Sequence, residues 1–345
     1  MSDFIQLHLL TSYPPSNLNR DDLGRPKTAV IGGSSRLRIS SQSLKRAWRT
    51  SELFEDALGA HKGLRTKSLG RELLKKLTTQ GVDEKKVKDW LAPIVKVFGK
   101  PEADDPLTTG QLFHISPEEL ALVDSLVSTL AQERRAPTDD ELKLLRADHK
   151  AADIAMFGRM LAEKPVFNTD AAVQVAHAFT VHKVQVEDDY FTAVDDLNRH
   201  EEDAGAGHLG ETGFGAGLFY LYLCIDKSLL LRNLGGDLAL ADRTLRALLE
   251  CATTVAPTGK QNSFASRAHA LFCLAERGSQ QPRSLALAFT RALKGDDVQD
   301  LAIGELLRLQ RNLDQVYGPR YRGCESFDVL RGEGSLQVLA DFISG

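Results

Sequence analysis

The segment from Arg36 to Arg49 carries the side chains whose chemistry is easiest to assign. Its Arg and Lys side chains can donate hydrogen bonds to phosphate oxygens, and Arg can do so through two parallel bonds. Ser40, Ser41 and Gln42 lie where a helix is expected to begin, and free backbone N–H groups there favour an anion. The segment therefore predicts binding to a nucleic-acid backbone, with ion pairs to acidic parts of the chain as the structural alternative.

Two further groups contain residue types that occur in metal sites. Asp21 and Asp22 are adjacent, and paired acids can hold a divalent cation for phosphodiester chemistry. Adjacent acids in one loop more often form turns or salt bridges. His177 and His182 have no Cys or carboxylate at ligand spacing. We expect no catalytic residue, no metal and no cofactor, while a metal-dependent ribonuclease using Asp21 or Asp22 remains the alternative function.

Two glycine-rich motifs resemble nucleotide-binding signatures only in part. Residues 205–210 read GAGHLG, but the strand and helix that flank a dinucleotide fingerprint are missing, so we expect a flexible turn. Residues 213–219 partly match the first motif of the RNA-recognition sheet. Ala216 stands where that motif has an aromatic residue, so we expect Phe219 and Tyr220 to pack in a core.

Charge is distributed unevenly along the sequence. The 345 residues carry a net charge of −4, yet residues 23–51 contain no acid and have a charge of +7. Residues 61–100 add another +7, which leaves −18 for the rest of the chain. Much of this negative charge lies in residues 187–203, where eight acids accompany Arg199 alone. This separation predicts a basic surface for an anion and an acidic surface elsewhere.

Composition limits the class of protein. A content of 42% hydrophobic and 26% charged residues is ordinary for a globular protein, and the length predicts two or three structural units. The longest apolar run, residues 218–225, is far shorter than the ~20 residues that cross a bilayer. Residues 1–20 show no secretory pattern, and four dispersed cysteines fit a reducing compartment. We therefore expect a cytoplasmic protein with no membrane contact.

Periodicity predicts the elements that position these residues. Residues 4–10 alternate as a strand, with Ile5, Leu7 and Leu9 toward a core and Gln6 and His8 on the other side. Ser40 and Ser41 offer an N-cap for a helix to about residue 57. Residues 60–165 are mostly helical. The further expected elements are helices at 148–161, 238–251 and 297–316, strands at 179–186, 218–225 and 263–276, and a loop or hairpin at 187–217. Strand, helix, strand, strand, helix, strand is the ferredoxin-like order.

Several long motifs resemble the signature of the CasC family, the repeated backbone subunit of the type I-E CRISPR interference complex, Cascade. The matching blocks are NRDD (19–22), RISSQSLKR (38–46), FGRM (157–160), QVAHAFT (174–180), VEDDY (186–190), TAVDDL (192–197), GAGHLGE (205–211) and PTGKQNSF (257–264). The blocks span residues 4 to about 275. Residues 60–150 and the tail after 280 match only loosely.

The resemblance implies an α+β, hand-shaped protein. An RRM-like (ferredoxin-like) palm would carry an inserted helical fingers domain and a long hairpin thumb. The implied boundaries are palm 1–58, fingers 59–168, a palm strand 169–186, thumb 187–217 and palm 218–345. Several copies would polymerise along one guide RNA (crRNA), join the other Cascade subunits, and present the guide for pairing with target DNA. A non-catalytic scaffold is thus the leading function, with a stand-alone RNA chaperone as a third possibility.

The resemblance, together with the charge pattern, also implies residue roles. The expected RNA-binding residues are Arg20, Lys27, Arg36, Arg38, Ser40, Gln42, Lys45, Arg46, Arg49, Lys260, Gln261 and Asn262. The residues expected to form the stacking wedge and the thumb are Met156, Met160, Thr192, His208 and Leu209. Met156 or Met160 would wedge bases apart, with core packing as the alternative for both. The lysines expected to attract target DNA are Lys67, Lys75, Lys85 and Lys86.

Overall fold

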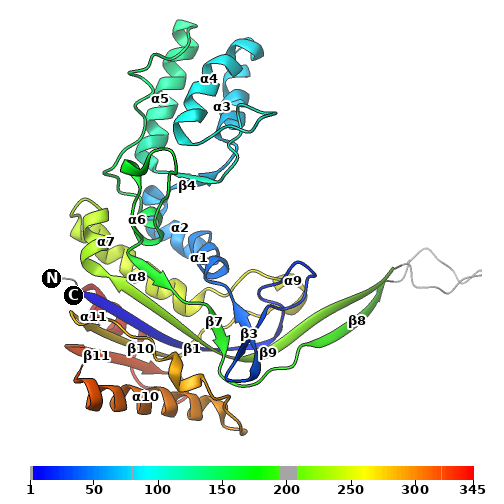
Figure 1. Cartoon of the computed structure of the whole chain (residues 1–345), viewed down its shortest axis with the longest axis vertical. Helices are drawn as coiled ribbons and strands as arrows, with labels where there is room; N and C mark the ends of the chain where they lie inside the picture. The colour runs from blue at the N-terminus through cyan, green and yellow to red at the C-terminus, as the bar shows by residue number, and fades with distance from the viewer. Residues whose placement is uncertain (1–2, 80, 194–207, 320) are drawn as a thin grey trace, which may run out of the picture.

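An antiparallel sheet is the frame of the protein (Figure 1). The computed structural model describes residues 3–79, 81–193, 208–319 and 321–345. In spatial order the main strands are β11 (Gly323–Asp328), β10 (Ala270–Gly278), β1 (Phe4–Ser16), β9 (His208–Asp226), β7 (Ala178–Thr180), β3 (Ser34–Ile39) and β2 (Thr28–Ile31). Two more strands, β6 (Val173–Val175) and β8 (Glu187–Ala193), also pair with β9. The predicted mixed class with an antiparallel sheet is confirmed.

The central strand β1 is longer than the predicted residues 4–10. It pairs with β10 on one side and with β9 on the other, starting from Phe4 opposite Gly278 and Asp226. The pairing with β9 continues past Tyr13 to Ser16, with a register shift between these two residues. Pro14 and Pro15 lie between these two residues, where the absence of a backbone N–H does not interrupt the hydrogen bonds between the strands.

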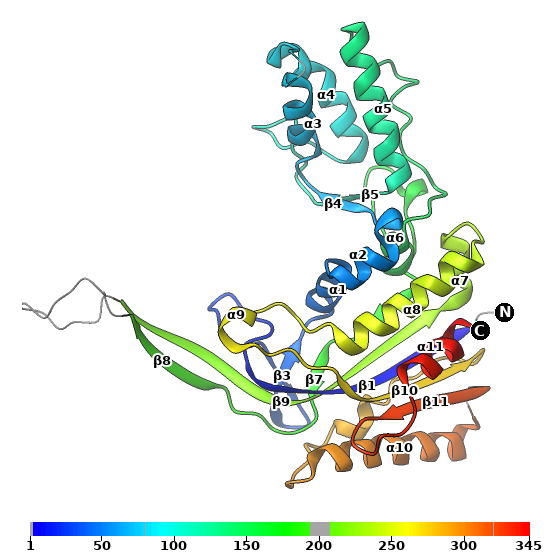
Figure 2. The same cartoon turned by 180° about the vertical axis from the view of Figure 1, so that it is seen from behind.

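Both faces of the sheet are covered (Figure 2). Ile5, Leu7 and Leu9 pack into a core with the helices on one face, as predicted. These helices are α1 (Ser41–Arg49), α2 (Glu52–Leu58), α6 (Ala152–Phe157), α7 (Lys227–Asn233), α8 (Leu238–Thr254) and α11 (Leu336–Ser344). On the other face, α10 (Val298–Tyr317) and η3 (Ala286–Phe289) form a second core with Leu10 and Tyr220. The side of β1 that carries Gln6 and His8 is therefore buried as well.

The fingers segment has a hydrophobic core of its own. Its elements are η1 (Gly59–His61), β4 (Leu64–Thr66), α3 (Leu69–Thr78), α4 (Glu84–Phe98), β5 (Phe113–Ile115), α5 (Pro117–Glu133) and η2 (Pro165–Phe167). Leu73, Leu91 and Val123 bring α3, α4 and α5 together. Figure 1 shows this group standing away from the sheet. Within the described parts of the chain, no helix has both the length and the apolar character that crossing a membrane requires.

Several predicted elements end earlier or begin later than expected. The helix predicted over 40–57 is two helices, because the Ser51 side chain accepts a bond from Phe54 N (3.2 Å) and starts α2. The helix predicted over 148–161 is only α6, which ends where Gly158 adopts a φ of 82°. The strand predicted over 263–276 begins only at β10, after the short helix α9 (Gln261–Phe264). Of the strand predicted over 179–186, only the first residues belong to β7.

A buried polar network lies under α10. His8 contacts the hydroxyl of Tyr220 through Nδ1 (2.9 Å) and the carboxylate of Glu276 through Nε2 (3.3 Å). Arg283 and Gln310 donate to the same carboxylate, so its charge is already balanced by a guanidinium. Burial lowers the pKa of His8 below its usual 6.5, with Glu276 opposing and Arg283 supporting the shift. The folded protein therefore holds His8 neutral.

Replacing His8 with Gln should make stability less dependent on pH below pH 6.5. Below pH 6.5, His8 binds a proton in the unfolded chain but not in the folded one. The free energy of unfolding therefore falls as the pH falls from 6.5 to the folded pKa of His8. One such proton changes the free energy of unfolding by at most about 1.4 kcal/mol per pH unit. Urea titrations from about pH 7 to about pH 5 measure the slope. A slope in His8→Gln equal to that of the wild type would contradict the assignment.

Candidate nucleic-acid interface

Helix α1 turns a polar, cationic side away from the core. Ser40 is its N-cap, as predicted, and its hydroxyl accepts a bond from Ser43 N (3.3 Å). The buried side of the helix packs against the sheet, whereas Gln42 and Arg46 are exposed. Lys45 is partly exposed and lies 5.4 Å from the centre of the Phe157 ring, and burial lowers its pKa. The helix can therefore offer two cations and an amide to an anion.

The loop after β1 and the β2–β3 hairpin extend this cationic surface. Asn19 accepts a bond from Ser40 N (2.8 Å), and Lys27 N donates to the Asn19 carbonyl (2.8 Å). Arg38 N in turn donates to the Lys27 carbonyl (2.8 Å), so these segments meet at the N-terminus of α1. Arg20, Lys27 and Arg38 are at least partly exposed there. These residues belong to the predicted phosphate-binding set, and their contact with RNA stays a prediction.

His177 belongs to this surface, although its sequence context indicated only that no metal is expected there. Its Nδ1 lies 2.6 Å from a guanidinium nitrogen of Arg38. Burial lowers the pKa of His177, and the positive charges of Arg38 and Lys27 add to the effect. The motif at 174–180 was the available signal, because it is one of the blocks that carry the family resemblance. The contact of His177 with Arg38 could not be predicted from the sequence, because the two residues are 139 positions apart.

A third segment, residues 257–265, packs against the first loop. A Cβ on Gly259 would lie 2.4 Å from the Leu18 carbonyl oxygen, so only glycine permits this close approach. Lys260 and Asn262 are exposed on the segment. Gln261 is used structurally, since its amide donates to the Pro257 carbonyl (2.7 Å). Lys260 and Asn262 thus stay in the candidate interface, whereas Gln261 shapes its own loop.

The structure corrects two predicted roles and limits a third. Arg36 is buried, and its guanidinium donates to the carbonyls of Thr180 (2.7 Å) and Phe289 (3.1 Å), so it is not a phosphate contact. Met156 is buried in the core beside the helices, so the predicted base wedge is wrong for this residue. Arg49 donates to buried Asp153 (3.2 Å) and has little freedom to reach RNA.

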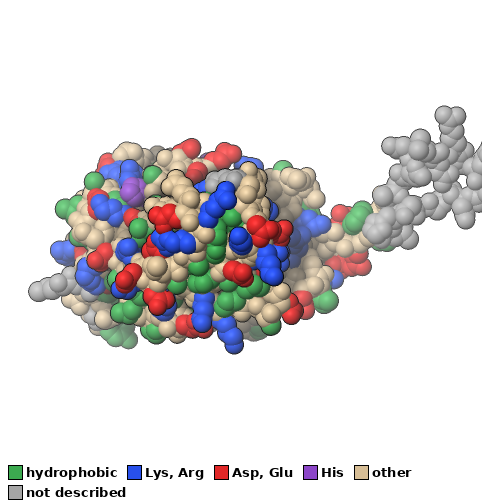
Figure 3. Space-filling model, turned by 90° about the horizontal axis from the view of Figure 1, so that it is seen from above, with side chains coloured by type: hydrophobic (Ala, Val, Ile, Leu, Met, Phe, Trp, Pro, Cys, Tyr) green, Lys and Arg blue, Asp and Glu red, His purple; other side chains and the backbone are tan. Residues whose placement is uncertain are grey.

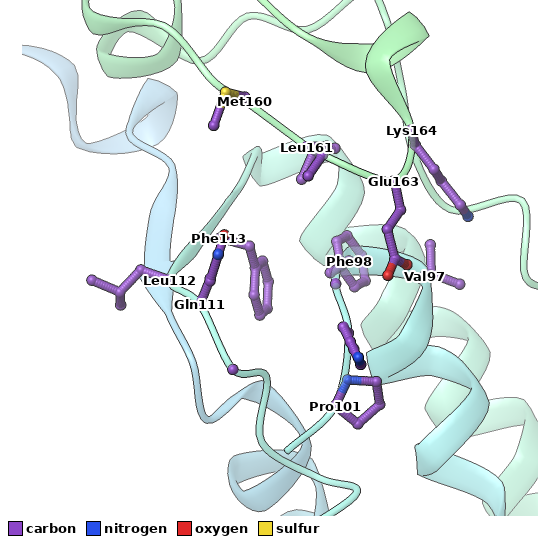
Figure 4. Close-up of a pocket in the computed structure, with 14 residues that line it drawn as sticks. Val97, Phe98, Pro101, Gln111, Leu112, Phe113, Met160, Leu161, Glu163 and Lys164 are labelled. Atoms are coloured by element: carbon purple, nitrogen blue, oxygen red, sulfur yellow. The ribbon is translucent and has the colours of Figure 1, made fainter. Parts of the chain in front are cut away.

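The remaining wedge candidates lie in two separate places. Met160 is 76% exposed and borders a cavity of about 410 Å³ whose lining includes Phe98 and Phe113 (Figure 4). Thr192 is exposed on β8 and pairs in register with Leu209, while Ala193 pairs with His208. Residues 194–207 lie outside the described residues. Within one chain, α6, which precedes Met160, and β8 lie far apart (Figure 1), so the structure does not bring the wedge candidates together.

The fingers lysines do not form a purely basic patch. Lys67 pairs with Glu102 (3.6 Å) and Lys75 with Glu72 (3.0 Å). Lys85 and Lys86 are exposed in the first turn of α4. Figure 3, which looks onto the fingers, shows basic and acidic side chains interspersed. Contact with target DNA at these lysines remains a prediction.

Asp21 has a structural task in the first loop. Its carboxylate accepts bonds from Leu23 N (3.0 Å) and Arg25 N (2.9 Å), as the turn-forming alternative expects. Asp22 is exposed beside it. Among the described residues, no group of three or more His, Cys, Asp or Glu side chains is placed to hold a metal ion.

Comparisons with known proteins found a matching family and similar solved structures. The family described as CT1975-like protein matches residues 5–337. A chain of a structure entitled "CRISPR RNA-guided surveillance complex, pre-nicking" has 32% sequence identity and a TM-score of 0.83, with 99% of both chains covered. A chain of a "CRISPR RNA-guided surveillance complex" has 27% identity and a TM-score of 0.72, again with 99% of both chains covered. A search of curated proteins found no match.

The contrast between Arg36 and Arg38 can be tested by mutation. Arg36→Met should lower the free energy of unfolding by about 2–4 kcal/mol, because buried carbonyls lose charged donors. Arg38→Met, two positions along the same strand, should cost less than about 1 kcal/mol because Arg38 is partly exposed. Urea unfolding measures both. Similar losses in the two variants would contradict the structural role of Arg36.

Proposed function

The chain belongs to the CT1975-like protein family, and we propose that it is the guide-RNA-binding backbone subunit of a CRISPR RNA-guided surveillance complex. The cationic surface around the N-terminus of α1 carries this proposal. It consists of Arg20, Lys27, Arg38, Gln42, Lys45, Arg46, Lys260 and Asn262. Cations of this kind bind phosphates regardless of base sequence. Sequence is then read by the guide itself, through pairing with target DNA.

We further propose that the complex is a type I-E Cascade in which several copies bind along one crRNA beside other subunits. The thumb ribbon, formed by β8 and residues 208–214 of β9, supports this proposal because it projects from the sheet (Figure 1). A projecting element can contact a neighbouring copy on the same RNA. The exposed edges of bases left between successive thumbs would then be available to target DNA.

The RRM-like description of the palm has support in the order of its strands. In space the strands follow the order β10-β1-β9-β7, with α1 and α8 on one face, and this is the order of a ferredoxin-like sheet. RRM domains usually stack bases on aromatic residues of the sheet. Here α10 and Tyr220 fill that face. We therefore propose that RNA runs along the loops and α1 at the root of the thumb, and not across the sheet.

The phosphate role of α1 can be tested with a charge-matched pair of variants. Lys45→Ala combined with Arg46→Ala should weaken binding to all guide sequences equally. The salt slope should fall by about 0.7 for each phosphate that the removed cations had neutralised. Fluorescence anisotropy against salt concentration measures both quantities. Lys85→Ala with Lys86→Ala removes the same charge from the fingers and should leave guide binding unchanged. Altered sequence preference with intact affinity would contradict the assignment.

We also propose that the subunit is a non-catalytic scaffold. Asp21 supports this view because its Oδ1 already accepts two backbone N–H groups that form the turn. Purified protein bound to guide RNA should leave a complementary RNA intact in Mg²⁺. Asp21→Asn and Asp22→Asn should give the same result as the wild type. Regularly spaced products that disappear in Asp21→Asn would replace the scaffold with a ribonuclease.

A further inference from the structure

We propose that Asn17 is a positioning residue that sets the direction of the thumb ribbon and couples it to the guide-binding loop. Asn17 is 0% exposed. Its Nδ2 donates to the carbonyl of Gly24 in the loop (2.9 Å) and to the carbonyl of Gly213 in the ribbon (2.9 Å). One amide group therefore joins the two segments. A flipped amide would place Oδ1 against both carbonyl oxygens, so the contacts define its orientation.

The ribbon needs such a contact because β1 no longer pairs with β9 beyond Gly215. The last pair between β1 and β9 is Ser16 with Gly215. Beyond Gly215, β9 continues with β8 as its strand partner, from Phe214 opposite Glu187 outward. A two-stranded ribbon bends and twists more freely than a sheet. Its direction therefore depends on side-chain contacts close to Gly213.

The ion pairs of Arg25 at the root of the ribbon are weaker than the hydrogen bonds of the buried amide. Arg25 pairs with Asp188 (2.8 Å) on β8 and more distantly with Glu211 (3.8 Å) on β9. These side chains are 44%, 45% and 60% exposed, and ion pairs in water contribute little. Buried hydrogen bonds are costly to lose because the carbonyls remain without a donor. The hydrogen bonds of Asn17 should therefore hold the ribbon in its direction more strongly than the ion pairs of Arg25.

The same loop is also attached to α1. Asn19, two residues after Asn17, accepts the bond from Ser40 N at the helix cap (2.8 Å). The chain between the two asparagines is short, so a displacement at the cap reaches Asn17. Phosphate binding at Arg20 or Lys27 acts on this loop directly. Guide binding and ribbon direction are thus linked through one loop, a step that rests on the proposed function.

A distance measurement without RNA tests the positioning role on its own. Spin labels at Tyr190→Cys on the ribbon and Arg243→Cys on α8 report the ribbon direction, with exposed Cys324 replaced by Ser. Asn17→Asp keeps the shape but loses both donors, and it should at least double the width of the distance distribution. The matched control Asn312→Asp makes the same change on an exposed residue of α10 and should leave the width unchanged.

Two further arms keep the proposal testable if Asn17→Asp does not fold. Asn17→Ser also removes the amide donors and should broaden the distribution. In the wild type, about 1 M salt screens Arg25 and should leave the distribution unchanged. Wild-type widths in a folded Asn17 variant would overturn the proposal. Broadening of the wild-type distribution by salt would also overturn it and assign the ribbon direction to Arg25.

RNA binding gives a readout that depends on the proposed function. A short RNA that covers one subunit should bind Asn17→Ser within about twofold of the wild type, because this variant keeps the cations and adds no charge. Cooperative assembly on a long guide should weaken by about tenfold or more, since misdirected ribbons cannot engage the next copy. Unchanged cooperativity would contradict the coupling. Failure of every variant and the wild type to bind RNA would reject the proposed function, while the distance result would still stand.

Discussion

The pairing of β1 with β9 is the constraint on which the rest of the structure depends. β9 runs from His208 to Asp226, and most of its length pairs with β1 between two hydrophobic cores. The same strand then leaves the sheet and forms the thumb ribbon with β8. The ribbon therefore begins from a backbone that the palm holds rigidly. Contacts at its root, chiefly from Asn17, determine where it points.

The glycines of the motif at residues 213–219 let other segments pack closely on β9 where it leaves the sheet. Gly213, Gly215 and Gly217 alternate along one side of β9, where other segments come close. A Cβ on Gly215 would lie 2.9 Å from Leu37, and one on Gly217 would lie 2.7 Å from Thr180. These side chains belong to β3 and β7. A motif that partly resembles an RNA-recognition signature is thus explained by packing, in agreement with the buried positions of its neighbours Phe219 and Tyr220.

Sequence patterns predicted the features that depend on neighbouring residues and missed those that depend on distant ones. The cap at Ser40, the helices near 238–251 and 297–316, and the central part of β9 follow from local spacing. The burial of Arg36 could not be predicted, because its acceptors Thr180 and Phe289 are 144 and 253 residues away. Asn17 was missed for the same reason, since Gly213 is 196 residues away.

We propose that guide RNA runs along the cationic surface at the root of the thumb. Photochemical crosslinking of the RNA that copurifies with the native complex, followed by mass spectrometry of the crosslinked peptides, tests this path most directly. The account predicts crosslinks in peptides that contain Arg20 to Lys27, residues 38–46 and residues 260–262. Crosslinks concentrated on α10 or on the outer side of the fingers, with these segments free, would contradict it.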